Sequence, residues 1–403
     1  MTNVLHILSQ KPFKTGSGVF FTNCIEELDK KGYNQAAIFA VEKNEEVKFN
    51  TKKWVLSYPV YFSSDELPFS VVGMSDVMPY NSTRYIDLNE EMLNQWINSF
   101  REAITKAVED FKPDVIICHH LYLLTALIRN MYPDKKIIGV CHATDIRQLG
   151  KHELMKEFIL ENINKLDCIF AHHEAEKREI VDLFNIEESK VKISYIGYND
   201  KIFYPSKDKT IGDKVHIVFT GKVSKAKGVE ELIKAYSNLP FKKDEVVLYI
   251  VGDGKGIEYD SIRALAKQSK LPIEFKGILT PYELADLYRK CEVFILPSFY
   301  EGMPLVLVEA LASGMVAIVS NLRGIKEMLG EKINKSNRIL YLKTPRMKDM
   351  DIPYEEDLPK FIRSIEENLI EMVNEVKLGK FQRNIDLSNL TWEKLSEKLE
   401  EEF

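Results

Sequence analysis

The residues best suited to chemistry in this sequence are two glutamates, Glu301 and Glu309, which lie inside a strongly apolar stretch. The stretch runs from Cys291 to Asn321 and reads CEVFILPSFYEGMPLVLVEALASGMVAIVSN. The simplest interpretation makes Glu301 a solvated turn residue and Glu309 a residue on a helix surface. A glutamate among leucine, valine and alanine needs a partner if it is buried, so Glu309 also fits a ligand site.

The same stretch predicts a strand, a turn, a helix and a second strand, which together form the βαβ unit of a parallel sheet. Pro304 suits the first helical position, because a residue there needs no N–H group. The N–H groups of Leu305, Val306 and Leu307 then have no partner within the helix, and the helix dipole favours an anion beside them. The two carboxylates would repel a phosphate but can accept hydrogen bonds from hydroxyls. Hydroxyls on both sides of a phosphate are the pattern of a nucleoside diphosphate sugar.

Histidines follow two strands that we expect in the N-terminal half. The apolar run Val115–Cys118 ends at His119 and His120, and a second run leads to His142 and Asp145. Ligands of open α/β sheets lie beyond the carboxyl ends of the strands, so these side chains are candidates for substrate contact. The alternative for each histidine is a hydrogen-bonded bystander.

Glycine-rich turns follow several expected strands. Gly16 and Gly18 precede a helix predicted over Val19–Lys31, and Gly252 and Gly254 follow a strand near Val251. The first pair lacks the third glycine of a dinucleotide-binding motif, and in the second Ile257 stands at its place. Close backbone approach to a ligand and a simple tight turn both remain open for the first pair.

Three motifs resemble the retaining glycosyltransferases of family 4, which have the GT-B fold. The stretch EGMPLVLVEALASG, with Gly324 and Glu327 downstream, resembles their E-x7-E signature. GKVSKAKG resembles their G-R-x-x-x-x-K-G motif, with Lys222 in place of the arginine. HATD resembles their H-G-T-D-like motif, with Ala143 in place of the glycine.

The resemblance implies an α/β protein of two Rossmann-like domains that face a cleft, with a C-terminal helix that crosses back to the first domain. We expect an acceptor-binding domain over residues 1–205, joined by the helix at about 385–403, and a sugar-nucleotide-binding domain over 206–384. The polar, breaker-containing segment 205–214 is the expected hinge.

The resemblance also implies roles for individual residues. His142, Glu301 and Lys227 are the expected catalytic residues, and Lys227 would stabilise charge on the departing nucleotide. The expected donor-binding residues are Gly16, Gly18, Lys222, Lys227, Gly252, Gly254, Gly277, Leu279, Glu301, Gly302, Met303, Pro304, Leu305, Val306 and Glu309. The candidates for acceptor contact are His120, Asp145, Tyr80 and Arg84, where Asp145 has an orienting role as its alternative.

An aromatic-rich segment at residues 50–90 lies outside the general family pattern. It holds Trp54, Tyr58, Phe62 and Tyr80, among others. One interpretation is packing on the first domain. The other is an insertion at the acceptor site, because aromatic faces suit sugar rings or an apolar acceptor.

Composition excludes several classes of protein. The 403-residue chain has a net charge of −6, which gives no reason to expect nucleic acid binding. No apolar run is long enough to span a bilayer, and the N-terminus does not resemble a signal peptide. Five single cysteines predict buried free thiols in a reducing cytoplasm. Asp349 and Asp351 form a D-x-D in a charged segment that we interpret as a solvated loop. The side chains of His172, His173 and Glu174 diverge on an extended chain. Neither set therefore predicts a metal site.

The expected function is therefore transfer of a hexose from a nucleoside diphosphate sugar to an acceptor hydroxyl, with retained configuration and without a metal or cofactor. A UDP-sugar is favoured over a GDP-sugar as donor. The acceptor is a glycolipid, a polysaccharide precursor or a small metabolite, with at most peripheral membrane contact. The alternatives are a non-catalytic sugar-nucleotide-binding module and a GT-B enzyme of different chemistry, epimerase-like or phosphorylase-like.

Overall fold

A computed structural model describes residues 2–76, 78–206, 212–349, 351–380 and 385–403. The chain divides into two compact units, of which the first holds residues 1–197 and 392–403 and the second holds residues 198–391. The middle of the expected hinge, residues 207–211, lies outside the described residues. Within the described residues, no helix is long and apolar enough to cross a membrane.

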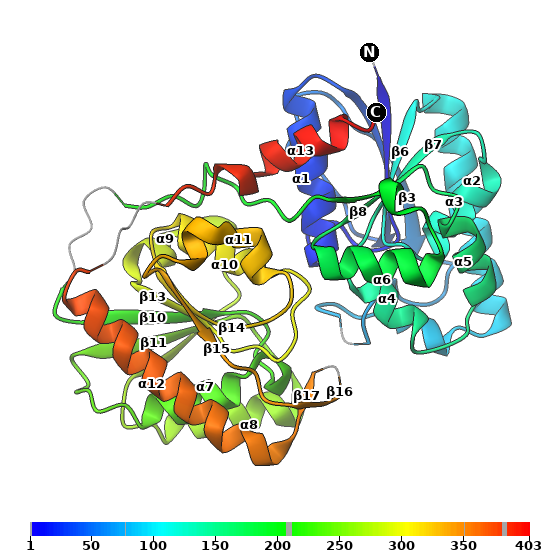
Figure 1. Ribbon diagram of the computed structural model, residues 1–403. Coiled ribbons are helices and arrows are strands. Elements are labelled where there is room, and N and C mark those ends of the chain that lie inside the picture. The colour runs from blue at the N-terminus through cyan, green and yellow to red at the C-terminus, as the bar shows by residue number, and fades with distance from the viewer. Residues whose placement is uncertain (1, 77, 207–211, 350, 381–384) are drawn as a thin grey trace. The chain divides into compact units, whose positions relative to one another are not determined.

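The first unit is built on a parallel sheet of seven strands in the order β3-β2-β1-β6-β7-β8-β9 (Figure 1). The strands are β1 Asn3–Leu8, β2 Asn34–Glu42, β3 Leu56–Phe62, β6 Val115–His119, β7 Lys136–Val140, β8 Cys168–Ala171 and β9 Val191–Ile193. Its helices are α1 Gly16–Lys30, α2 Glu90–Phe111, α3 Leu123–Met131, α4 Thr144–Leu149, α5 Lys156–Ile163, α6 Glu174–Phe184 and α13 Trp392–Glu400.

Strand β2 shows how this sheet is buried on both faces. Ala36, Ile38 and Ala40 enter one hydrophobic cluster, and the alternate residues Ala37 and Phe39 enter another. Successive side chains of a strand point to opposite faces, so a continuous apolar run is what such a buried parallel strand needs. The polar residues lie at the carboxyl ends of these strands.

The second unit has a parallel sheet of six strands in the order β12-β11-β10-β13-β14-β15. The strands are β10 Val215–Thr220, β11 Val246–Val251, β12 Ile273–Gly277, β13 Val293–Leu296, β14 Val316–Ser320 and β15 Ile339–Leu342. Its helices are α7 Val229–Ser237, α8 Gly256–Lys267, α9 Pro281–Lys290, α10 Leu305–Ala312, α11 Ile325–Asn334 and α12 Leu358–Lys377. The predicted two-domain α/β fold with parallel sheets is thus confirmed.

Helix α13 returns to the first unit, where it packs beside α1 (Figure 1). Trp392 lies with its ring 5.4 Å from that of Phe20 at 87°. A Cβ on Gly197 would come within 2.5 Å of the Trp392 ring, so glycine at this position lets the chain pass close to the indole. The C-terminal helix predicted to cross back to the first domain is therefore present.

Most of the aromatic-rich segment packs into the core of the first unit. Tyr58, Phe62 and Tyr85 are buried in the same cluster as Trp96 of α2. Trp54 and Tyr61 are exceptions, with 86% and 45% of their surfaces exposed. The segment adds two short strands, β4 Val72–Gly73 and β5 Thr83–Arg84, which pair with each other. These contacts favour the packing interpretation.

Candidate functional site

An ion pair between Lys227 and Glu301 lies at the start of α10 in the second unit. Lys227 Nζ lies 2.7 Å from Glu301 Oε2 and donates to the carbonyl of Tyr300 at 3.1 Å. Ser298, which is fully buried, donates to Glu301 Oε1 at 2.6 Å. Both oxygens of Glu301 are therefore engaged, and the carboxylate is held rather than free in solvent.

Helix α10 begins beside this pair. It starts at Leu305 with Pro304 as its N-cap, so the prediction of Pro304 at the first helical position is wrong by one residue. The proline still ends the preceding turn, since its fixed φ permits the extended backbone seen there. The N–H groups of Leu305 and Val306 lack acceptors within the helix and carry the positive end of its dipole.

Glu309 lies farther along α10 in an apolar setting. Burial raises the pKa of its carboxyl to about 8. Burial, followed by the charge of Glu309, raises the pKa of Tyr288, whose hydroxyl donates to Thr220 at 2.9 Å. Glu309 is half-buried, so part of it is open to a ligand. A hydroxyl-bearing ligand would supply the hydrogen bonds that this carboxylate needs to ionise.

Glycines bring the loops after β10, β11 and β13 close together. A Cβ on Gly252 would lie 1.9 Å from the carbonyl oxygen of Gly221, and one on Gly254 would lie 2.5 Å from that of Val223. Gly228 faces Pro297 in the same way, at 2.1 Å. The loops that carry Lys222, Lys227 and Glu301 are thus packed against one another at the carboxyl edge of the sheet.

The other predicted donor residues of the second unit are less buried or have open space around them. Lys222 is exposed, and Gly302 and Met303 are half-buried. Gly277 adopts a φ of 68° at the end of β12 and has no heavy atom near its missing Cβ. Its carbonyl accepts from the N–H of Gly252 at 2.8 Å, which ties the Gly277–Leu279 turn to the neighbouring loop.

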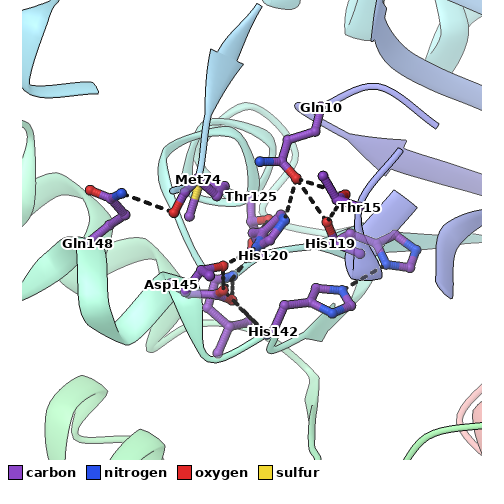
Figure 2. A network of polar contacts seen from close by, with 12 residues as sticks. Gln10, Thr15, Met74, His119, His120, Thr125, His142, Asp145 and Gln148 are labelled. Atoms are coloured by element: carbon purple, nitrogen blue, oxygen red, sulfur yellow. Dashed lines mark hydrogen bonds and ion pairs between the residues drawn. The ribbon is translucent and has the colours of Figure 1, made fainter. Parts of the chain in front are cut away.

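In the first unit, a buried network joins the ends of β6 and β7. Figure 2 shows His120 between Gln10 and Asp145, with Thr15 beside Gln10. His120 Nδ1 lies 2.9 Å from Asp145 Oδ1, and its Nε2 lies 3.3 Å from Gln10 Oε1. Asp145 also accepts from the backbone N–H groups of Leu121 at 2.7 Å and His142 at 3.2 Å.

The electrostatics of Asp145 follow from these contacts. Burial alone would raise the pKa of its carboxyl, but the His120 ring and the two backbone N–H groups together hold that pKa below its usual value. The side chain is fully buried. Of the two roles that the sequence left open, an orienting role fits such a residue better than contact with an acceptor.

His142 lies beside this network, in a cluster of rings. Its Nε2 is 3.2 Å from Nδ1 of His119 (Figure 2). The Phe20 ring meets it nearly at a right angle, at 5.3 Å between centres, and His172 approaches at 5.7 Å. Burial, followed by the charges of His120 and His119, lowers the pKa of His142 well below its usual value. The ring is therefore a neutral hydrogen-bonding group near neutral pH.

The two glycines of the first loop differ in what they do. Helix α1 begins at Gly16, three residues before the predicted start, because the Thr15 side chain accepts from the N–H of Gly18 at 3.0 Å and caps it. A Cβ on Gly18 would lie 2.7 Å from the carbonyl oxygen of Lys11, whereas nothing lies near Gly16. Gly18 is thus required for packing, and its N–H is already used by the cap.

Two predicted acceptor residues lie apart from the network. Arg84 is exposed and forms a bidentate ion pair with Asp87. Nζ of Lys11 lies over the ring of Tyr80, 5.0 Å from its centre, and burial raises the pKa of the Tyr80 hydroxyl. His120, by contrast, is at the centre of the network but nearly fully buried.

The residues His173, Glu176 and Asp349 have structural roles. His173 caps α6 by accepting from the N–H of Glu176 at 3.1 Å, while Glu176 accepts from the N–H of His172 at 2.6 Å. Asp349 belongs to a strand, β16 Met347–Asp349, which pairs with β17 Ile352–Pro353, so the expected loop is in fact a short hairpin. No three histidine, cysteine, aspartate or glutamate residues are grouped for a metal within the described ranges.

Sequence reasoning missed three residues of these sites: Gln10, Phe20 and Ser298. Ser298 had a local signal, because a serine three residues before a glutamate in a turn is well placed to hydrogen-bond it. Gln10 and Phe20 had none, since their partners His120 and His142 lie more than a hundred residues away in the chain.

Family models match the two units in turn. Residues 15–201 match the model described as Glycosyltransferase Family 4, and residues 200–341 match that described as Glycosyl transferases group 1. Among curated proteins, an uncharacterised glycosyltransferase of Methanocaldococcus jannaschii is 30% identical over 39% of this chain and 43% of its own. The serotype-specific mannosyltransferase WbdA of Escherichia coli is 27% identical over 48% of this chain and 26% of its own. The chain thus spans less than half the length of these relatives.

Solved structures share the fold along the whole chain. Sucrose-phosphate synthase from Thermosynechococcus elongatus superposes with a TM-score of 0.69 at 16% identity, covering 100% of this chain and 98% of its own. A protein of Anabaena in complex with UDP and glucose gives a TM-score of 0.63 at 14% identity, covering 100% and 99%. At such identities the likeness shows the fold alone.

Proposed function

This chain belongs to the glycosyltransferases of the GT-B fold, and from that premise we propose that it transfers a sugar from a nucleoside diphosphate sugar to an acceptor hydroxyl. The observation that carries the proposal is the Lys227–Glu301 pair beside the start of α10. A cation, a helix N-terminus and a carboxylate in one place suit a phosphate linked to a hydroxyl-rich sugar.

Each group of this site has a proposed task. Lys222, Lys227 and the first N–H groups of α10 hold the pyrophosphate and stabilise the charge that grows on it as the sugar departs. Glu301 and the backbone at Gly302 and Met303 hold the donor sugar. Glu309 accepts hydrogen bonds from the ribose. The loops that end β11 and β12 line the nucleotide through Gly252, Gly254, Gly277 and Leu279.

We further propose that His142 contacts the transferred sugar and that the configuration at its anomeric carbon is retained. In this same-face mechanism the leaving phosphate oxygen takes the proton of the acceptor hydroxyl. The lysines and the helix dipole supply positive charge for the leaving group, which supports a metal-independent reaction.

The donor and acceptor are proposed at the level of their classes. A UDP-sugar is favoured as donor, supported by the Anabaena neighbour crystallised with UDP and glucose. A glycolipid, a polysaccharide precursor or a small metabolite serves as acceptor, and one relative is named for transfer to a diphospho-undecaprenol carrier. The five buried, free cysteines favour a reducing compartment such as the cytoplasm.

The test is a panel of UDP-, GDP-, ADP- and dTDP-sugars added to the purified chain in excess chelator, scored for thermal stabilisation and nucleotide release. Stabilisation and release with one donor are the expected result. Stabilisation without release, even after acceptors of each class are added, would identify a sugar-nucleotide-binding module instead. Release that depends on a divalent ion would contradict the metal-independent mechanism.

A further inference from the structure

The contact between His119 and His142 has the geometry of a directed hydrogen bond between two imidazoles. Their ring planes differ by 18°, and their centres lie 5.5 Å apart while the bonded nitrogens lie 3.2 Å apart. Near-parallel rings with that spacing lie edge to edge rather than face to face. The His119 Nδ1–His142 Nε2 line therefore points along both rings, as a linear hydrogen bond requires.

The direction of this bond follows from the other nitrogen of His119. Nε2 of His119 is buried and has no hydrogen-bond partner within the part of the chain that the structure describes. Burial lowers the pKa of His119 well below its usual value, so the ring carries one proton. Buried N–H groups without a partner are rarer in folded proteins than acceptors without one, so that proton belongs on Nδ1.

The neighbouring histidine has a different task and does not compete for this role. His120 contacts Asp145 and Gln10 through its two nitrogens, and Asp145 holds the backbone N–H of His142. The His120–Asp145 pair thus positions the main chain of His142. The imidazole itself bonds His119 through Nε2, and the rings of Phe20 and His120 approach it at 5.3 and 4.8 Å between centres.

We propose that His119 is a positioning residue for the transfer proposed above: its Nδ1–H donates to Nε2 of His142 and so keeps the proton of His142 on Nδ1. His142 then presents an N–H donor, rather than a bare nitrogen, to a hydroxyl of the bound substrate. A site built to donate a hydrogen bond selects a substrate oxygen that can accept one at that position. The role in transfer rests on the proposed function, but the hydrogen bond between the two rings does not.

The first measurement is the ¹⁵N chemical shifts of the histidine rings in the full chain, labelled at histidine and free of substrate. We expect a protonated Nδ1 and an unprotonated Nε2 for His142, with the spectrum assigned by a His142→Asn variant. His119→Asn keeps an amide donor near the position of Nδ1 and should preserve the His142 pattern. His119→Phe removes the donor and should let the His142 proton redistribute between its nitrogens.

The second measurement is kcat for the donor found in the panel. His119→Phe should lower it about tenfold, the cost of one hydrogen bond, whereas His119→Asn should stay within about threefold of the unmodified chain. His6→Phe is the matched control, because His6 is equally buried, packs against the same Phe21 ring and bonds Gln35 instead of His142. It should leave kcat and the His142 shifts unchanged.

Three outcomes overturn the inference: a proton on Nε2 of His142 in the unmodified chain, equal losses in His119→Asn and His119→Phe, or an equal loss in His6→Phe. If no sugar nucleotide is turned over, the proposed function fails and the positioning role with it. The nitrogen shifts then still decide whether His119 donates to His142.

Discussion

The two units use the same kind of parallel sheet to build opposite kinds of site. In the second unit the carboxyl edge carries charged side chains that are partly exposed, with Lys227 paired to Glu301. In the first unit the same edge carries buried histidine rings and the buried carboxylate of Asp145, whose oxygens are all occupied by partners.

The difference suggests that the site of the second unit binds a charged ligand, whereas the network of the first unit holds side chains in fixed positions. Partly exposed charges can exchange one partner for another when an anion arrives, at little cost to folding. Buried, saturated polar groups cannot, because each lost contact leaves an unpaired group in a low dielectric. Substitutions in the Lys227–Glu301 pair should therefore act on turnover, and substitutions in the Asp145 network should act on stability.

The largest effect is expected from Glu301→Gln, which keeps the size of the side chain and removes its charge. Turnover should fall about 10²–10³-fold, as for loss of a group that acts on the transition state, while nucleotide affinity and the melting temperature change little. The measurement is kcat together with calorimetric titration of the nucleotide. Glu274→Gln, which breaks the exposed pair with Lys276, is the control. Equal donor hydrolysis by Glu301→Gln and the unmodified chain would remove Glu301 from the catalytic residues.

Asp145→Asn tests the opposite behaviour in the first unit. The change should destabilise this unit by about 2–3 kcal/mol, because it weakens a buried charged contact to His120 and two contacts to backbone N–H groups. Hydrogen exchange should show the loss in peptides from β6 and β7 and none in the second unit. Asp87→Asn, at the exposed pair with Arg84, should have no such effect. A fully stable Asp145→Asn protein would show that the network does not hold the unit together.

A ribose contact of Glu309, as proposed above, would make nucleotide binding depend on pH. Its carboxyl has a pKa of about 8 without ligand, and a carboxylate must be ionised to accept two ribose hydroxyls. Affinity should therefore rise with pH up to about 8, by close to tenfold per unit below that value, and then level off. Titration calorimetry in two buffers of different ionisation heat should also detect release of a proton. Flat affinity between pH 6.5 and 9 would contradict a ribose contact.

The Glu309 carboxyl also makes folding stability depend on pH, in the opposite direction to nucleotide affinity. Its folded pKa lies above the unfolded value of 4.5, so the folded chain binds the extra proton and stability falls as pH rises from there to about 8. Glu309→Gln should therefore melt at a higher temperature than the unmodified chain at pH 8.5 but not at pH 5. The variant should bind nucleotide more weakly and without pH dependence.

The smallest effects are expected from a matched pair of glycine substitutions at the start of α1. Gly18→Ala places a Cβ against the carbonyl of Lys11 and should destabilise the first unit by about 1–3 kcal/mol. Gly16→Ala meets nothing and should be neutral or slightly stabilising. Chemical denaturation of both variants is the measurement. Equal stabilities would show that the loop moves away from the new Cβ without cost.

Local patterns were enough to predict the strands and helices around the candidate site, whereas the arrangement in two domains came from the family resemblance. Buried parallel strands need continuous apolar runs, and breakers with polar residues must follow them, so the unit from Val293 to Ser320 was readable from its own residues. Errors stayed within a turn, as at Pro304 and Gly16, where side-chain capping decided the first residue of the helix. The Asp349 hairpin was missed because short strands carry too little pattern.

The sequence by itself determined the two α/β units, the motif at the start of α10 and the residue types that make a sugar-nucleotide site, because each depends on residues within a few turns of one another. Only the tertiary structure decided which side chains meet. Lys227 reaches Glu301, Gln10 reaches His120, and Trp392 joins His119 and His142 around Phe20. Those pairings arise where parallel strands end side by side. The separation of residues along the chain does not predict which strands become neighbours in the sheet.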